Sequence, residues 1–295
     1  MKTYLHGLAK ILNEGEERED RTGTGVIGIF GTQQRYNLER SFPAVTTKKL
    51  AWKSVVSELL WFIEGSGDER RLCEILHGTR NSDKTTIWTQ NANADYWKRK
   101  AEYEGDCGRI YGVQWRHWIA SSIKHAPELN ASIVVQTEID QLSNLINGIK
   151  TDPYGRRHIL SAWNPGELNC MALPPCHVFA QFYVSKSNKL SCQLYQRSND
   201  MFLGCPFNIA SYSLLTHMIA QVCNLKVGEF IHTTGDAHIY LNHIDQVKEQ
   251  LSRTPWQSPK LWLNPDITDI DKFTMNDVKL VGYEHHPPIT ANMAV

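Results

Sequence analysis

The chain has 295 residues, 41% of them hydrophobic, and its 31 Lys and Arg side chains balance its 31 Asp and Glu side chains. This length can bury a large core, and the neutral balance excludes the polyelectrolyte surface on which nucleic-acid binding depends. No apolar run approaches the roughly 20 residues that span a bilayer, and the first residues lack a secretory apolar segment, so we expect a cytoplasmic protein. Seven cysteines without paired spacing fit a reducing compartment and indicate neither a disulfide framework nor a metal site.

The first half of the chain predicts mainly helices. The first dozen residues have a helical pattern, and residues 28–38 alternate as a strand does. Residues 50–63 have the pattern of a mostly buried helix that includes Glu58, and a carboxylate there must be paired, hydrogen-bonded or catalytic. Residues 119–136 show no clear periodicity, and we expect an inserted surface loop. Shorter helices are expected at residues 69–77, 96–104 and 138–149.

Strands dominate from His158 onward. Residues 178–184 and 190–195 have strand patterns, and the turn-like Ser187-Asn188-Lys189 between them predicts a hairpin. A helix at 207–224, a strand at 229–240 and a helix at 242–252 follow. The pattern predicts an α+β fold in which helices cover a mixed or antiparallel twisted sheet. Since no linker, repeat or low-complexity run divides the chain, we expect one domain over residues 1–295.

A cysteine and an arginine meet at the predicted hairpin. Leu173-Pro174-Pro175-Cys176-His177 precedes its first strand, and Gln196-Arg197-Ser198-Asn199-Asp200 follows its second strand, so both motifs lie at one end of the sheet. A cysteine attacks as its thiolate, which a nearby guanidinium stabilises. Cys176 is therefore the candidate nucleophile. The other cysteines are expected to be buried or partly buried small hydrophobes: Cys73, Cys107, Cys170, Cys192, Cys205 and Cys223.

A series of short blocks, in order along nearly the whole chain, resembles the folate-dependent thymidylate synthases. Besides the two motifs above, the blocks are residues 20–25 (DRTGTG), 58–62 (ELLWF), 111–116 (YGVQWR), Arg156-Arg157, 206–212 (PFNIASY), 235–240 (GDAHIY) and 293–295 (MAV). The resemblance implies a homodimeric methyltransferase that converts dUMP to dTMP. It also implies that 5,10-methylenetetrahydrofolate donates the carbon and the hydride, leaving dihydrofolate.

The resemblance implies a catalytic role for several side chains. Cys176 would add to C6 of uracil, which makes the neighbouring C5 nucleophilic. Glu58 would manage protons near uracil O4 through ordered water, and its apolar helix should raise its pKa. Tyr111 would position the water that removes the C5 proton. The alternatives are a structural ion pair for Glu58 and ordinary aromatic packing for Tyr111.

Base selection falls to Asn208, whose amide can accept from uracil N3–H while donating to O4. Its alternative role is the N-cap of a helix beginning at Ile209. Arg156 and Arg157 would come from the second subunit, although an adjacent arginine pair is otherwise a common surface feature. By resemblance, the phosphate ligands are Arg21, Arg156, Arg157, Arg197 and Ser198; His238 and Tyr240 bind the ribose 3′-hydroxyl; His177, Gln196 and Asp200 complete the nucleotide site.

The implied folate site comprises Lys48, Trp88, Asp200, Gly204 and Val295. Asp200 would accept hydrogen bonds from the pterin, Trp88 would stack near the transferred carbon, and closure of residues 293–295 would exclude water.

Two departures from the family pattern concern this region. Thr89-Gln90-Asn91 replaces the acid that commonly follows the stacking tryptophan, and Cys107 and Arg109 introduce a thiol and a cation ahead of Tyr111. They admit a rival enzyme, a dUMP hydroxymethylase in which water captures the methylene intermediate, but the retained Trp88 and Val295 favour methylation. A third reading is a non-catalytic, RNA-binding family member. The neutral charge and the intact set of catalytic candidates argue against it.

Overall fold

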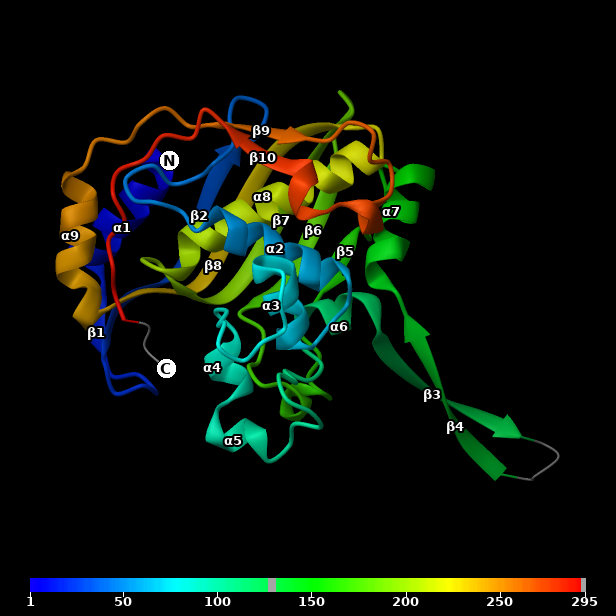
Figure 1. Cartoon of the computed structure of the whole chain (residues 1–295). Coiled ribbons are helices and arrows are strands. Elements are labelled where there is room, and N and C mark those ends of the chain that lie inside the picture. The colour runs from blue at the N-terminus through cyan, green and yellow to red at the C-terminus, as the bar shows by residue number, and fades with distance from the viewer. Residues whose placement is uncertain (127–130, 293–295) are drawn as a thin grey trace.

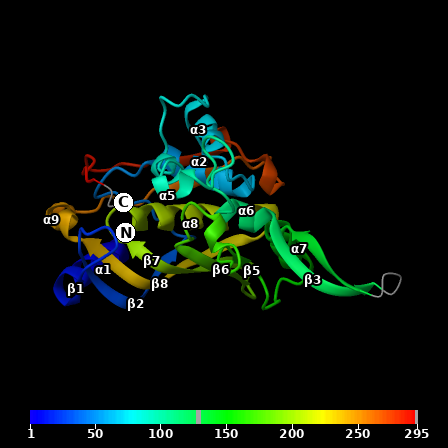
Figure 2. The same cartoon turned by 90° about the horizontal axis from the view of Figure 1, so that it is seen from below.

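The computed structural model describes residues 1–126 and 131–292, and its centre is one mixed six-stranded sheet (Figure 1). Neighbouring strands are antiparallel except β7 and β8, which are parallel. Figure 2 shows most of the helices on one side of this sheet. The predicted α+β class with a mixed sheet is therefore confirmed. In spatial order the strands are β1 (Glu16–Arg18), β2 (Val26–Asn37), β8 (Lys226–Tyr240), β7 (Lys189–Asp200), β6 (His177–Val184) and β5 (Ile159–Ser161).

The connections of β6, β7 and β8 determine where the chemistry lies. The predicted hairpin is present: β6 and β7 are antiparallel, and Asn188 adopts φ 55° in the turn between them. Parallel strands need a crossover, and α8 (Gly204–Val222) supplies it between β7 and β8. Asp200 pairs with His238, so the carboxyl ends of the two parallel strands lie side by side at one end of the sheet.

Two helices form the interior of the helical layer. α8 is buried on almost all sides, and α2 (Trp52–Ile63) packs against it with residues 55–63 buried. The amphipathic α1 (Lys2–Glu14) covers β2, and α9 (Ile244–Ser252) lies beside α1. The remaining elements are α3 (Glu69–His77), α4 (Thr89–Ala92), α5 (Asp95–Lys98), α6 (Tyr111–Arg116), α7 (Gln141–Thr151), β9 (Lys260–Leu263) and β10 (Val278–Val281).

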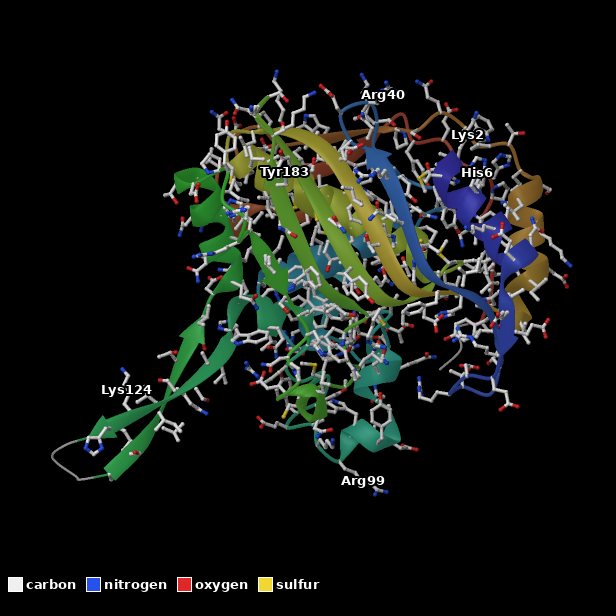
Figure 3. The ribbon with its side chains drawn as sticks, turned by 180° about the vertical axis from the view of Figure 1, so that it is seen from behind. Lys2, His6, Arg40, Arg99, Lys124 and Tyr183 are labelled. Carbon is white, nitrogen blue, oxygen red and sulfur yellow. The ribbon has the colours of Figure 1, made fainter. Side chains whose placement is uncertain are left out.

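The opposite face of the sheet is open to solvent (Figure 3). Along β6, Ala180 and Phe182 are buried, while Phe179 and Tyr183 are exposed, which is the period-2 alternation of a strand with one covered face. Tyr183 is 65% exposed, and Phe30 on β2 is 83% exposed. In the described part of the chain, no helix crosses this face.

The expected surface loop at residues 119–136 is instead a β-hairpin. β3 (Trp118–Ala126) pairs with β4 (Ala131–Ile139) in antiparallel register, and the pair projects from the body of the molecule (Figure 1). Ile123 and Val134, which are cross-strand partners, are 77% and 68% exposed. The sequence carries no alternation here because neither face of the arm is buried. Residues 127–130 lie outside the described part.

Three further expectations were wrong in detail. The helix expected at 96–104 is only α5, because Asp106 accepts the Glu102 N–H at 2.9 Å and its carbonyl accepts from Trp97 Nε1 at 2.7 Å, which folds the chain back. α8 begins at Gly204 and not at Phe207. Cys170 is exposed.

Within residues 1–126 and 131–292, no helix combines the length and the hydropathy needed to cross a membrane.

Candidate active site

Cys176 and Arg197 face each other at the end of the β6–β7 hairpin, as the sequence predicts. The Arg197 N–H donates to the Cys176 carbonyl at 2.9 Å, and Arg197 Nη2 lies 3.9 Å from Cys176 Sγ. The guanidinium is fixed by bonds of 2.9 Å to the carbonyls of Pro174 and Pro175, and it lies 5.4 Å from the ring centre of Trp163. The cation is therefore held by the loop that carries the thiol.

The ionisation of Cys176 reflects two opposing influences. Burial raises the pKa of the thiol above its ordinary value of 9.0, while the charge of Arg197 and a hydrogen bond with Tyr111 lower it. Burial prevails. The Arg197 guanidinium lies where the sequence predicts. Its charge does not outweigh the effect of burial, so the Cys176 thiol is protonated at neutral pH in the free protein.

Tyr111, the first residue of α6, braces the backbone at the thiol. Its hydroxyl accepts the Cys176 N–H at 2.7 Å. Its ring stacks on Phe62 at 4.9 Å and lies 5.1 Å from His177. Burial raises the pKa of Tyr111 well above 10.0, so the hydroxyl remains neutral.

Glu58 occupies the buried face of α2 and has one strong partner. Trp88 Nε1 donates to Glu58 Oε1 at 2.7 Å. Burial raises the pKa of Glu58 to about 7, and the bond from Trp88 opposes that shift. A carboxyl group that is half protonated near pH 7 suits acid–base chemistry.

The amide of Asn208 is oriented by a chain of buried side chains. Gln196 Nε2 donates to Asn208 Oδ1 at 3.1 Å, and Gln196 Oε1 is 2.8 Å from His232 Nε2. Since burial lowers the pKa of His232 to about 3, its ring is neutral, and Nε2–H is the donor. The His232 donor therefore identifies the accepting oxygen of the Gln196 amide, and the Gln196 donor in turn identifies the accepting oxygen of the Asn208 amide. The alternative role of Asn208 as an N-cap is wrong, because α8 begins at Gly204.

His232 was not identified from the sequence. It lies on β8 among the buried alternate residues Phe230, His232 and Thr234, and the alternation of buried residues shifts at Gly235, so its burial does not follow from the positions of His238 and Tyr240.

Asp200, Gly204 and Lys48 surround the start of α8. Asp200 Oδ1 accepts the N–H groups of Phe202 and Leu203 at 2.9 and 3.1 Å, which holds the turn that leads into the helix. A Cβ atom on Gly204 would lie 3.7 Å from Asn208 Oδ1, so this glycine borders the Asn208 amide. Lys48 donates to the Phe202 carbonyl at 2.5 Å, and burial lowers its pKa to about 8.

His238, Tyr240 and the turn that carries Arg21 lie at the end of the sheet where β7 and β8 finish. His238 Nδ1 is 3.1 Å from Asp236 Oδ1, and the two rings of His238 and Tyr240 are 5.2 Å apart. β2 begins opposite Tyr240, directly after the turn that carries the exposed Arg21. Asp20 holds that turn by accepting the Gly25 N–H at 2.8 Å. Burial, followed by the charge of Asp200, raises the pKa of Tyr240 to about 12.

Arg156 and Arg157 lie apart from this group. Both are exposed before β5 and line a cavity of about 710 Å³ with residues of α7. In the described part of the chain, neither makes a hydrogen bond or ion pair with the other phosphate-ligand candidates. Ser198 contributes its carbonyl, which accepts from Gln196 Nε2 at 2.9 Å. Val295 lies outside the described residues.

The two residues ahead of Tyr111 that depart from the family pattern, Cys107 and Arg109, make structural contacts. Cys107 is fully buried, and burial raises its pKa. Arg109 pairs with Glu167 at 2.8 Å and donates to the His117 carbonyl at 2.6 Å. Neither side chain is directed at Cys176 by these contacts.

A thiol beside a fixed guanidinium is typical of enzymes that use a cysteine nucleophile, and Tyr111 contacts both the thiol loop and the Trp88 ring that binds Glu58. Comparison with known proteins specifies the kind: the thymidylate synthase family model matches residues 2–295, and the chain belongs to this family. The chain is 50% identical over 297 residues to the bifunctional dihydrofolate reductase-thymidylate synthase of Zea mays. That match covers 99% of this chain and 54% of the relative, so the chain spans about half the relative's length.

Proposed function

We propose that the protein is a thymidylate synthase that methylates dUMP to dTMP. In this proposal 5,10-methylenetetrahydrofolate donates the carbon and the hydride, and dihydrofolate is the second product. The observation that carries the proposal is the position of Arg197 Nη2, 3.9 Å from the Cys176 thiol. A cation there stabilises the sulfur as it loses its proton and attacks. Membership of the thymidylate synthase family supports the same activity.

The proposed chemistry divides between three residues. Cys176 adds to C6 of uracil and leaves an enolate across C4, C5 and O4, so that C5 can attack the folate carbon. Glu58, with a pKa of about 7, exchanges protons near O4 through water. Tyr111 positions the water that takes the C5 proton, and its bond to the Cys176 N–H keeps the thiol loop in place.

Recognition of uracil rests on the orientation of Asn208. Because Gln196 donates to Oδ1, the Nδ2 group of Asn208 is left to donate to O4, and the second lone pair of Oδ1 accepts from N3–H. Cytosine presents the opposite pattern at these two positions, so the fixed amide disfavours it. The other proposed nucleotide ligands are Arg21, Arg197, Ser198, His177, Asp200, His238 and Tyr240; the proposed folate ligands are Lys48, Trp88, Asp200, Gly204 and Val295.

We further propose a homodimer in which Arg156 and Arg157 reach the partner's phosphate site. Their exposure, away from Cys176 of the same chain, supports this arrangement. The open sheet face with Phe30, Phe179 and Tyr183 supports a self-association surface, since large exposed apolar side chains gather at interfaces.

We also propose that residues 1–295 act as one catalytic domain, which the single six-stranded sheet supports. A cytoplasmic location is supported by the seven unpaired cysteines, because thiols stay reduced in that compartment.

One assay tests the activity. Incubation with dUMP and methylenetetrahydrofolate should give dTMP by mass and the absorbance rise of dihydrofolate. Formation of 5-hydroxymethyl-dUMP with return of tetrahydrofolate would instead support the hydroxymethylase, which no comparison favours.

Substitution of the thiol tests the mechanism. Cys176→Ser should lower turnover by at least about three orders of magnitude while dUMP still binds, because only the covalent step is lost. Cys170→Ser, at the exposed thiol, is the matched control and should keep full activity. Undiminished turnover in Cys176→Ser would refute the assignment.

A further inference from the structure

The turn that carries Trp88 is tied to a buried carboxylate on α3. Glu69 Oε1 accepts from the hydroxyls of Thr86 and Thr89, each at 2.7 Å. The Thr86 N–H donates to Thr89 Oγ1 at 2.8 Å, and the Trp88 N–H donates to Thr86 Oγ1 at 3.1 Å. The backbone of Trp88 is therefore connected to Glu69 through the hydroxyl of Thr86, and the hydroxyl of Thr89 ties the same turn to Glu69.

Glu69 is a fixed point for this turn. Its other oxygen accepts from Arg70 Nε at 2.7 Å and forms an ion pair with Arg70 Nη2 at 2.5 Å, and the Glu69 and Arg70 side chains are only 1% and 9% exposed. Arg70 is itself held by bonds to the carbonyls of Asn81 and Lys84, at 2.8 and 3.1 Å. Every charge in this cluster is paired and hydrogen-bonded, which is the condition for a buried ion pair to be rigid.

The other end of the connection is the proposed catalytic carboxyl. Trp88 Nε1 donates to Glu58 Oε1 at 2.7 Å, and the indole packs against Trp61 at 5.6 Å and Tyr111 at 5.8 Å. Since this donor lowers the pKa of Glu58 against the effect of burial, the position of the indole affects how readily Glu58 exchanges its proton.

We propose that Glu69, Thr86 and Thr89 are positioning residues that hold the indole of Trp88 on the Glu58 carboxyl and thereby adjust proton transfer in the active site. The inference rests on the proposed function. It also explains why a threonine suits position 89. A hydroxyl donates to Glu69 while it accepts the Thr86 N–H, whereas an ionised carboxylate could not donate and would face Glu69 across a contact of 2.7 Å. In this chain the carboxylate that anchors the turn is Glu69 on α3 and not a residue at position 89.

The first test needs no substrate. The indole N–H resonance of Trp88, in protein labelled with ¹⁵N-tryptophan and assigned with Trp88→Phe, should titrate with Glu58 at a midpoint of about 7. Thr89→Val removes the hydroxyl and keeps the shape, so the donor bond weakens and the midpoint should rise by roughly 0.5 to 1 unit. Thr89→Ser should restore the wild-type midpoint. Thr85→Val, at an exposed threonine of the same segment, is the matched control and should not change it.

The second test uses turnover. In Thr89→Val, kcat near neutral pH should fall roughly three- to tenfold with the KM for dUMP within about twofold, and the pH profile should move upward with the midpoint. Thr86→Val should act in the same direction, which guards against poor folding of one variant. The proposal is overturned if the Trp88 midpoint is the same in Thr89→Val and Thr85→Val, or if kcat falls while the midpoint stays in place. If the wild-type protein makes no dTMP, the proposed function fails, but the resonance titration still decides the positioning role.

Discussion

Glu58 is a single residue whose ionisation is set by its surroundings. Its pKa of about 7 in the fold exceeds the ordinary value of 4.5 because the carboxyl is buried between α2 and the Trp88 turn. Between these two pH values the folded protein keeps a proton that the unfolded chain has lost. The stabilising contribution is therefore complete below about pH 4.5 and is lost as the pH rises through 7.

Glu58→Gln should remove this pH dependence. The amide has the same shape but does not ionise, so the free energy of unfolding of the variant should gain about 3 kcal/mol on the wild type between pH 4.5 and pH 8. Urea unfolding at a series of pH values measures the difference. A difference between the two proteins that stays constant with pH would contradict the raised pKa.

His232 is expected to control base selection without contacting the base. It fixes Gln196, which in turn fixes the amide of Asn208. His232→Phe should let the Gln196 amide turn, and the ratio of kcat/KM for dUMP over dCMP should fall roughly fivefold, since one orienting hydrogen bond contributes about 1 kcal/mol. His217→Phe is the control, because His217 is a partly buried histidine on α8 outside this chain of contacts. Equal ratios in the two variants would argue against the role of His232.

At the scale of elements, the sequence predicts best where local pattern and tertiary contact agree. α3 begins after Asp68, whose side chain accepts the Arg70 N–H at 2.9 Å, and ends at Gly78 with φ 74°. Both ends are therefore determined by capping residues next to the helix in the sequence. The β6–β7 hairpin was predictable for the same reason: alternation and a turn lie within one short segment.

Elements that depend on distant partners were not predictable. α8 begins three residues earlier than its apolar pattern indicates, directly after a turn whose N–H groups Asp200 binds from the end of the preceding strand. The Glu69–Thr89 bond joins residues in separate elements, so the sequence shows only a threonine where an acid is common. Sequence patterns thus indicate the candidate site residues more readily than the residues that hold them in place.

The β3–β4 arm is an element whose removal should be tolerated. An isolated two-stranded hairpin is marginally stable, and this arm projects away from the sheet that carries Cys176. Replacing residues 122–135 by a two-residue Asn-Gly turn should keep the pairing of Ser121 with Gln136. We expect the melting temperature to change by less than about 3 °C and kcat for dTMP formation by less than about twofold. A loss of folding would show that the arm contributes to the core.

At the scale of the whole molecule, the two faces of the sheet differ in kind. One face is covered by α8 and α2, and the other exposes Phe30, Phe179 and Tyr183 without a covering helix in the described part (Figure 3). Covering this face with a second copy would bury these side chains on both subunits, as an isologous interface requires. Arg156 and Arg157 precede β5, at an edge of the same sheet.

Mixed dimers test the exchange of arginines directly. Coexpression of Cys176→Ser with the double variant Arg156→Ala/Arg157→Ala, under two different affinity tags, allows purification of dimers with one subunit of each kind. If the arginines serve the partner, the subunit with the intact thiol receives intact arginines from Cys176→Ser, and the mixed dimer should have about half the wild-type kcat per dimer. If they serve their own subunit, one site lacks the thiol, the other lacks the arginines, and the mixed dimer should be as inactive as its parents. Dimers purified with one tag each from wild-type subunits control for the effect of the tags.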